Sequence, residues 1–142
     1  MRVLIGVDDS AESRHAVDTA FEFFGSDAEY LVASFGERMP FYSTSFAGGS
    51  IVSSVNLSEQ FDAAADAARQ RAITAAAKLP LDSEIVFDVG HAGRSLCDLA
   101  EDQHVNAIVI GSQDKTVWER LLDPSVGRYL IDHAPCPVVV VR

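Results

Sequence analysis

The sequence predicts a doubly wound α/β fold, in which one five-stranded parallel sheet carries helices on both faces. Five short apolar runs recur along the chain, and four segments with helical spacing separate them. The runs show little polar alternation, which is typical of strands covered on both faces. Strands that alternate with helices favour parallel pairing through crossover connections.

The first two strands and the helix between them are predicted within residues 2–35. Arg2–Val7 is an apolar run that ends in Asp8-Asp9-Ser10, the pattern of a buried strand followed by a helix start. The next segment repeats apolar residues at three- and four-residue steps until Gly25, and Tyr30–Phe35 is the second strand. The apolar positions of this first helix are Val17, Ala20, Phe21 and Phe24.

Residues 36–57 are rich in serine, glycine and aromatic residues and are expected to form a flexible loop. A loop of this length exceeds the usual connection of a few residues, and long loops typically act as lids or binding loops or are disordered. Two interpretations stay open: a lid over a site, or aromatic contacts with a second subunit.

The second half of the chain supplies the longest helix and the remaining elements. Ser58–Leu79 carries an apolar stripe through Phe61, Ala65, Ala68 and Ala72, and Pro80 follows it. The elements expected after it are a strand at Ser83–Val89, a helix at Gly93–Asp102, a strand at Asn106–Gly111, a helix at Pro124–His133 and a strand at Pro137–Val141. Cys97 is on the inward face of its helix, so we expect a core role for it.

Length and charge narrow the functional classes. The 142 residues suit a single domain spanning 1–142, and 48% hydrophobic residues suit a folded chain. The net charge of −10 argues against nucleic acid or an anionic membrane as partner. No apolar run approaches the roughly 20 residues of a membrane helix. The two cysteines form no disulfide framework and the four histidines show no ligand spacing, so we expect a cytoplasmic protein without a metal site.

The candidate site lies where two strands end in polar or glycine-containing sequence. These ends are Asp8-Asp9-Ser10 and Gly111-Ser112-Gln113-Asp114. In parallel sheets, ligands bind beyond the carboxyl ends of the strands, and a helix start there favours an anion. The stretch from Gly111 to Arg128 matches no Walker loop, and no G-x-G-x-x-G follows the first strand.

Several stretches resemble the universal stress protein family along essentially the whole chain. They are VLIGVDDSAES, VGHAGRSLCDLAE, NAIVIGS and HAPCPVVVVR. The resemblance implies a Rossmann-like sheet in the order 3-2-1-4-5, often a homodimer, and a role in stress response.

Many members of that family bind ATP through a motif written G-x2-G-x9-G-[S/T]. On this chain the first glycine falls on Gly111, the second on Asp114, the third on Pro124 and the closing serine on Ser125. Two glycines are therefore replaced. Asp114 places a carboxylate where a phosphate would approach, and Pro124 has no N–H to donate. An Asp-Pro pair at 123–124 is also a self-sufficient helix start.

Other residues match the family's pocket. Its first-strand acid, which contacts the adenosine portion, falls on Asp8, and Phe35 falls where a small aliphatic residue usually flanks the base; Phe35 either stacks on a purine or fills its space. Ser10 and Ser112 suit turn and cap roles as well as ligand contacts. Arg128 is either a phosphate contact or a solvated helix residue.

The sequence contains no complete set of catalytic residues for the enzyme and phosphoacceptor classes that we considered. A receiver domain needs an acid ending the third strand and a lysine ending the fifth, whereas Asp88 lies inside the third strand and Arg142 ends the chain. No G-x-S-x-G elbow is present for a hydrolase. Two hypotheses remain: a homodimeric stress-response module with weak or no ATP binding, or an adenine-nucleotide (ATP or AMP) switch with at most slow hydrolysis.

The last strand predicts how two copies meet. The family's order would place Val138–Val141 at a sheet edge, and an apolar edge strand invites pairing with another chain. We expect antiparallel pairing of two such strands about a two-fold axis.

Overall fold

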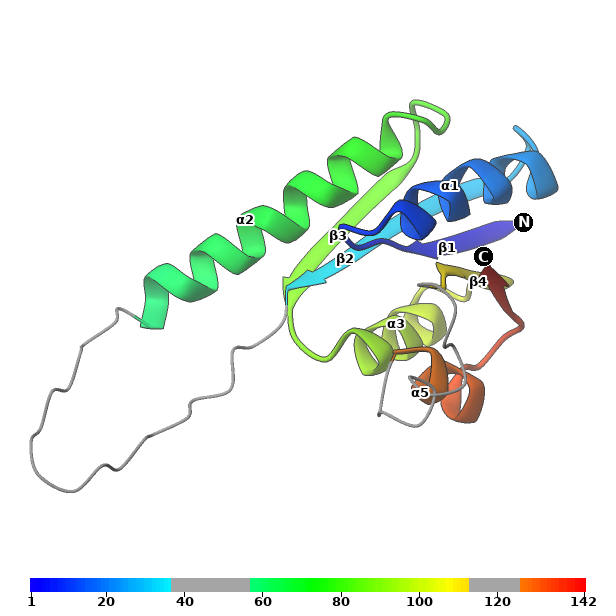
Figure 1. The fold of residues 1–142 in the computed structure, drawn as a ribbon. Helices are drawn as coiled ribbons and strands as arrows, with labels where there is room; N and C mark the ends of the chain where they lie inside the picture. Colours follow the sequence, from blue (N-terminus) through cyan, green and yellow to red (C-terminus); the bar gives the residue numbers. More distant parts are fainter. Residues whose placement is uncertain (37–56, 113–125) are drawn as a thin grey trace, which may run out of the picture.

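A computed structural model describes residues 1–36, 57–112 and 126–142. The strands are β1 (Arg2–Gly6), β2 (Glu29–Gly36), β3 (Glu84–Val89), β4 (Ala107–Gly111) and β5 (Val138–Val141). The helices are α1 (Ala11–Phe24), α2 (Leu57–Ala76), α3 (Ala92–Asp102) and α5 (Val126–His133). All strand pairs are parallel, and the order β3-β2-β1-β4-β5 confirms the predicted fold class and topology (Figure 1).

The core has two layers, one on each face of the sheet. Val3 and Ile5 of the central strand pack with α1 and α2, while Leu4 packs with α3 and α5 on the opposite face. All three side chains are fully buried. The absence of polar alternation in this strand therefore has the predicted cause, because helices cover both of its faces (Figure 1).

Local signals set both ends of α1. The Ser10 side chain accepts a hydrogen bond from the Ser13 N–H, which is the N-cap arrangement that favours serine before a helix. At the other end Gly25 has φ of 74°, a left-handed conformation that glycine adopts without a steric cost. Both ends agree with the sequence prediction.

Helices cover both faces of the sheet as predicted, but β3 is more open than the central strands. Ile85 and Phe87 are 38% and 41% exposed, and Glu84 and Asp88 are exposed as well. The reason is position, because β3 is an edge strand and pairs only with β2 among the described residues. Its apolar composition alone did not reveal that place.

The helices differ from prediction chiefly at their ends. The second helix spans Leu57–Ala76, and its predicted apolar residue Phe61 is 37% exposed, whereas Ala68 and Ala72 are fully buried. Figure 1 shows the cause: the first turns of α2 extend past the end of β2. The first residues predicted for the last helix, with Pro124, lie outside the described residues, as do nearly all of residues 36–57.

Candidate functional site

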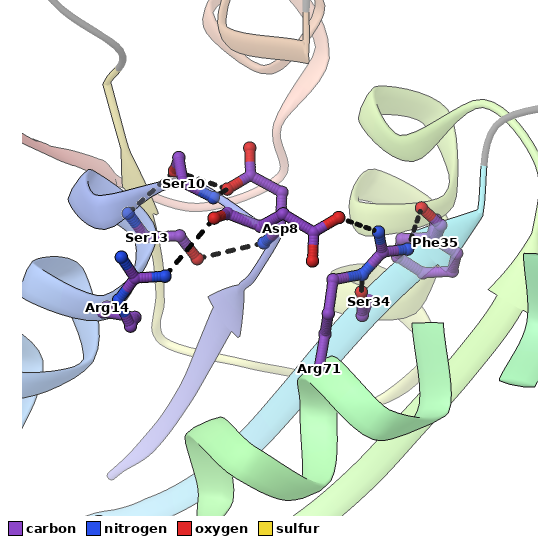
Figure 2. A network of polar contacts seen from close by, with 8 residues as sticks. Asp8, Ser10, Ser13, Arg14, Ser34, Phe35 and Arg71 are labelled. Carbon is purple, nitrogen blue, oxygen red and sulfur yellow. Dashed lines mark hydrogen bonds and ion pairs between the residues drawn. The ribbon is translucent and has the colours of Figure 1, made fainter. Parts of the chain in front are cut away.

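The turn between β1 and α1 is a small network of polar groups at the carboxyl edge of the sheet (Figure 2). The Asp8 carboxylate accepts hydrogen bonds from the Ser10 N–H at 2.9 Å and from the Ser10 hydroxyl. The Ser13 hydroxyl accepts from the Asp8 N–H at 3.0 Å, and the Ser13 N–H donates to Ser10 Oγ at 3.0 Å. The structure thus brings together Asp8 and Ser10, as predicted, and adds the buried Ser13, which sequence reasoning missed.

This network changes what the start of α1 can bind. The N–H groups at a helix start attract anions because they have no partner within the helix. Here side chains of the turn itself take the N–H groups of Ser10 and Ser13. The exposed carboxylates of Asp8 and Asp9 add negative charge beside them. The turn therefore suits a hydroxyl or amine donor better than a phosphate.

The end of β4 lies against the first turn of α1. A Cβ added to Gly111 would stand 2.4 Å from the Glu12 carbonyl carbon and 2.5 Å from the Ser13 nitrogen. No side chain fits at that separation, so glycine is required here by packing, whatever ligand binds nearby. The next residue, Ser112, donates its N–H to the Val141 carbonyl at 2.7 Å and extends the pairing of β4 with β5.

Phe35 stands at the end of β2. Its half-buried ring packs against the core cluster on the α3 and α5 face. Its carbonyl faces the other way in the network of Figure 2, where it lies 3.5 Å from Nη2 of Arg71. The two predicted interpretations, stacking on a purine or filling its space, both stay predictions.

Arg71 of α2 is the main site residue that sequence reasoning missed. Its Nη1 donates to Asp9 Oδ2 at 2.7 Å and its Nε donates to Ser34 Oγ at 3.1 Å. The Arg71 side chain is only 19% exposed, and Ser34 is fully buried. Arg71 thereby joins α2 to the ends of β1 and β2 (Figure 2). A signal was present, since Arg71 follows Ala68 by three residues and lies beside the apolar stripe.

A groove of about 370 Å³ runs between α1 and α2 beside this network. Apolar residues such as Val17 and Ala75 line part of it, and Arg14, Arg71 and Lys78 line its polar part. Two of these cations are neutralised by ion pairs, Arg71 with Asp9 and Lys78 with Asp18. Arg14 donates to the Asp9 carbonyl at 3.3 Å.

The other predicted site residues are not joined to this network. Arg128 is exposed on α5 and its Nε donates to Asp132 Oδ2 at 3.0 Å, one helical turn away. That pairing is the geometry expected of a solvated helix residue. Asp114 and Ser125 lie outside the described residues, so the phosphate-loop part of the prediction stays a prediction.

No group of three or more metal-ligating side chains occurs among residues 1–36, 57–112 and 126–142. Cys97 is buried in the core, as expected, and burial raises the pKa of both Cys97 and Cys136. Raised pKa values lower the thiolate fraction that reacts with oxidants. Within the same ranges no helix is long and apolar enough to cross a membrane.

The sequence profile of the universal stress protein family matches residues 1–142. The universal stress protein UspA from Lactobacillus plantarum is 25% identical, with a TM-score of 0.64 over 100% of this chain and 97% of that chain. No curated protein sequence matches.

Two further solved structures are similar in fold. A universal stress protein in complex with cAMP is 22% identical, with a TM-score of 0.64 over 100% of this chain and 96% of that one. A universal stress protein from Archaeoglobus fulgidus in complex with dAMP is 19% identical, with a TM-score of 0.62 over 100% and 98% of the two chains. At these identities the likeness speaks for the fold.

Proposed function

The chain belongs to the universal stress protein family, and from that membership we propose that it is a stress-response protein whose site at the carboxyl edge binds ATP weakly or not at all. The observation that carries the proposal is the turn after β1. There Asp8 and Ser10 occupy N–H groups that a phosphate would need. The exposed Asp8 carboxylate forms no ion pair among the described residues and would repel a polyphosphate, whereas Arg71 offsets the charge of Asp9.

The replaced glycines of the phosphate motif act in the same direction. In the sequence motif, Asp114 places a further carboxylate beside the phosphates, and Pro124 removes a backbone donor. Together with the capped turn, they leave the phosphates few donors and several repulsive charges. The proposal therefore separates affinity for phosphate from affinity for the nucleoside.

A second candidate is an adenine-nucleotide switch, and one observation favours it. Solved relatives of similar fold carry cAMP and dAMP. Asp8 falls on the acid that in the family contacts the adenosine portion, and only one of its carboxylate oxygens, Oδ1, accepts a hydrogen bond from the described residues. Its other oxygen suits a ribose hydroxyl, which is a donor. Under this alternative adenosine or AMP binds, and ATP is the weaker ligand.

Calorimetric titration of the full chain with Mg-ATP, AMP and adenosine tests both candidates. We expect no ATP binding in the low-micromolar range, and stronger ATP binding after Asp114→Gly with Pro124→Gly. If adenosine or AMP binds, Asp8→Asn weakens it about tenfold or more, because a hydrogen bond to a charged acceptor is lost. Low-micromolar ATP binding by the wild-type chain contradicts the first candidate.

Thermal melting with the same three ligands provides an independent readout. A ligand that binds only the folded state raises the melting temperature in proportion to its occupancy. Stabilisation by adenosine or AMP supports the switch. If none of the three ligands shifts the melting temperature, the result supports a stress-response protein that binds no nucleotide.

We also infer that the protein is a homodimer through β5. Val140 is 45% exposed, and β5 pairs on one side with β4 and with no other described strand. An uncharged valine strand at a sheet edge is a template for pairing with a second copy.

A further inference from the structure

The outer edge of β3 has backbone groups turned to solvent. Gly90 donates its N–H to the Gly36 carbonyl at 2.9 Å, so its backbone points toward β2. Backbone groups of successive strand residues point to alternate edges, so Val86 and Asp88 also point toward β2. Ile85, Phe87 and Val89 therefore present their N–H and C=O groups on the outer side, where no described strand pairs with them.

One of these outward groups is already occupied. The Val89 N–H donates to the Asp88 carboxylate, at 2.7 Å from Oδ1. The N–H groups of Ile85 and Phe87 have no such partner among the described residues. The free part of the edge is thus short, and the contact between Val89 and Asp88 marks one end of it.

The side chains around this edge combine apolar surface with negative charge. Ile85 and Phe87 lie on the α2 face and are 38% and 41% exposed. The guanidinium carbon of Arg69 lies 5.8 Å from the centre of the Phe87 ring. Glu84 and Asp88 are exposed on the other face, where Val86 lies half-buried between them. Arg2 pairs with Glu84 through one oxygen, Oε2 at 2.7 Å, and the Glu84 side chain stays 61% exposed.

A second copy of the chain does not suit this edge. In an antiparallel two-fold pairing, Ile85 of one copy must face Phe87 of the other for all free N–H groups to bond. That register places Glu84 opposite Asp88 at both ends, and like charges directly opposite destabilise a strand pair. Each copy also carries a net charge of −10. The edge therefore favours a partner of opposite charge.

We propose that the outer edge of β3 binds an extended peptide segment as an added antiparallel strand, with basic side chains opposite Glu84 and Asp88 and apolar side chains opposite Ile85 and Phe87. The main-chain bonds supply affinity and the flanking charges supply register, as in other strand-addition complexes. The pattern that fits is basic, apolar, any residue, apolar, basic. This proposed peptide site does not depend on whether the protein binds a nucleotide.

Fluorescence anisotropy with a labelled peptide Gly-Lys-Val-Thr-Ile-Lys-Gly tests the proposal on the full chain. We expect saturable binding, and at least tenfold weaker binding for the same peptide with both lysines changed to glutamate. The double variant Glu84→Gln with Asp88→Asn removes the charges but keeps an acceptor for the Val89 N–H. It should weaken binding about fivefold, which is the range of two exposed ion pairs. Equal binding of the two peptides overturns the proposal.

A backbone variant separates strand addition from simple charge attraction. Ile85→Pro removes an outward N–H and leaves the bonds to β2, since proline is tolerated on edge strands when its nitrogen faces solvent. We expect Ile85→Pro to abolish peptide binding and Ile85→Ala to weaken it only a few-fold. Hydrogen exchange supplies a readout independent of folding: the amides of Ile85 and Phe87 should become protected in the complex, and the Val89 amide should not change. Protection absent at both residues overturns the proposal.

Discussion

Gly111 has one explanation from the sequence and another from the structure. In sequence it is the first glycine of a phosphate motif, and the sole one of three that is kept. In the structure its missing side chain leaves room for the first turn of α1, whose Glu12 carbonyl carbon would lie 2.4 Å from an added Cβ. A contact to main chain cannot be relieved by rotating a side chain. Packing alone is thus sufficient to require glycine here.

Replacing Gly111 by alanine should lower the free energy of unfolding by about 2 kcal/mol or more, because a well-packed interior tolerates overpacking poorly. Gly90→Ala is the matched control. Its added Cβ would lie 3.4 Å from Ser95 Oγ, an ordinary contact, so we expect a change within about 0.5 kcal/mol. Urea denaturation followed by circular dichroism measures both. Equal stability of the two variants would show that the close contact at Gly111 is absent in solution.

At this same scale, the sequence predicts contacts between neighbours better than contacts between distant residues. Asp8 and Ser10 were expected together, and they bond over two residues. Arg71 and Asp9 are 62 residues apart, and no local pattern specifies that distance. The helical period places Arg71 beside the buried stripe of α2. It does not state which carboxylate the guanidinium meets.

Among the elements, α2 depends on one charged side chain for its position at the strand ends. Arg71 contacts Asp9 and the hydroxyl of the fully buried Ser34 from a position only 19% exposed. Seven residues further along, just after the end of α2, Lys78 pairs with Asp18 at 2.7 Å, but both side chains are nearly half exposed. The two ion pairs have similar lengths and different surroundings. We therefore expect the more buried pair to contribute more to the stability of the fold.

Arg71→Met should destabilise the fold by about 2 kcal/mol, since a buried hydroxyl loses its donor and Asp9 loses its partner. Lys78→Met removes a pair of similar length that water already screens, so its cost should stay below about 1 kcal/mol. Both substitutions keep an apolar stem of comparable length, one on α2 and one just after its end. Chemical denaturation under identical conditions compares them. A cost for Arg71→Met no larger than that for Lys78→Met would contradict the anchoring role.

The helices and strands could be predicted from the sequence because apolar runs and helical spacing are local properties. The place of an element in the sheet is not local. Glu84 and Asp88 flank Val86 on one face of β3, but these residues alone do not distinguish an edge strand from the end of a central one. The order of strands came from the family resemblance, and only that order distinguishes an edge from a centre.

On the scale of the whole molecule, the sheet ends in two edges of opposite character. At β3 exposed acids flank the free backbone groups, whereas β5 consists of four valines. Self-pairing brings identical side chains together, so it is penalised at the acidic edge and not at the uncharged one. A net charge of −10 keeps copies apart elsewhere on the surface. This difference is the basis on which we propose a second copy at β5 and a basic partner at β3.

The proposed pairing of two copies through β5 has a specific register. The carbonyls of Pro137 and Val141 accept hydrogen bonds from β4 at 2.9 Å and 2.7 Å, so their backbones point inward. By alternation Val138 and Val140 point outward. A two-fold axis through Val139 then pairs Val138 of each copy with Val140 of the other, and every outward group has a partner.

Val140→Pro should therefore convert a dimer into a monomer while leaving the bonds to β4 in place, because its nitrogen faces outward. Sedimentation equilibrium at micromolar concentration gives the mass directly. Ile85→Pro is the matched control, since it places the same residue at the outward position of the other edge and should leave the dimer intact. A wild-type chain that sediments as a monomer contradicts the pairing. So does a Val140→Pro variant that stays dimeric, and a loss of dimer in both variants would show that proline acts through the fold and not through the edge.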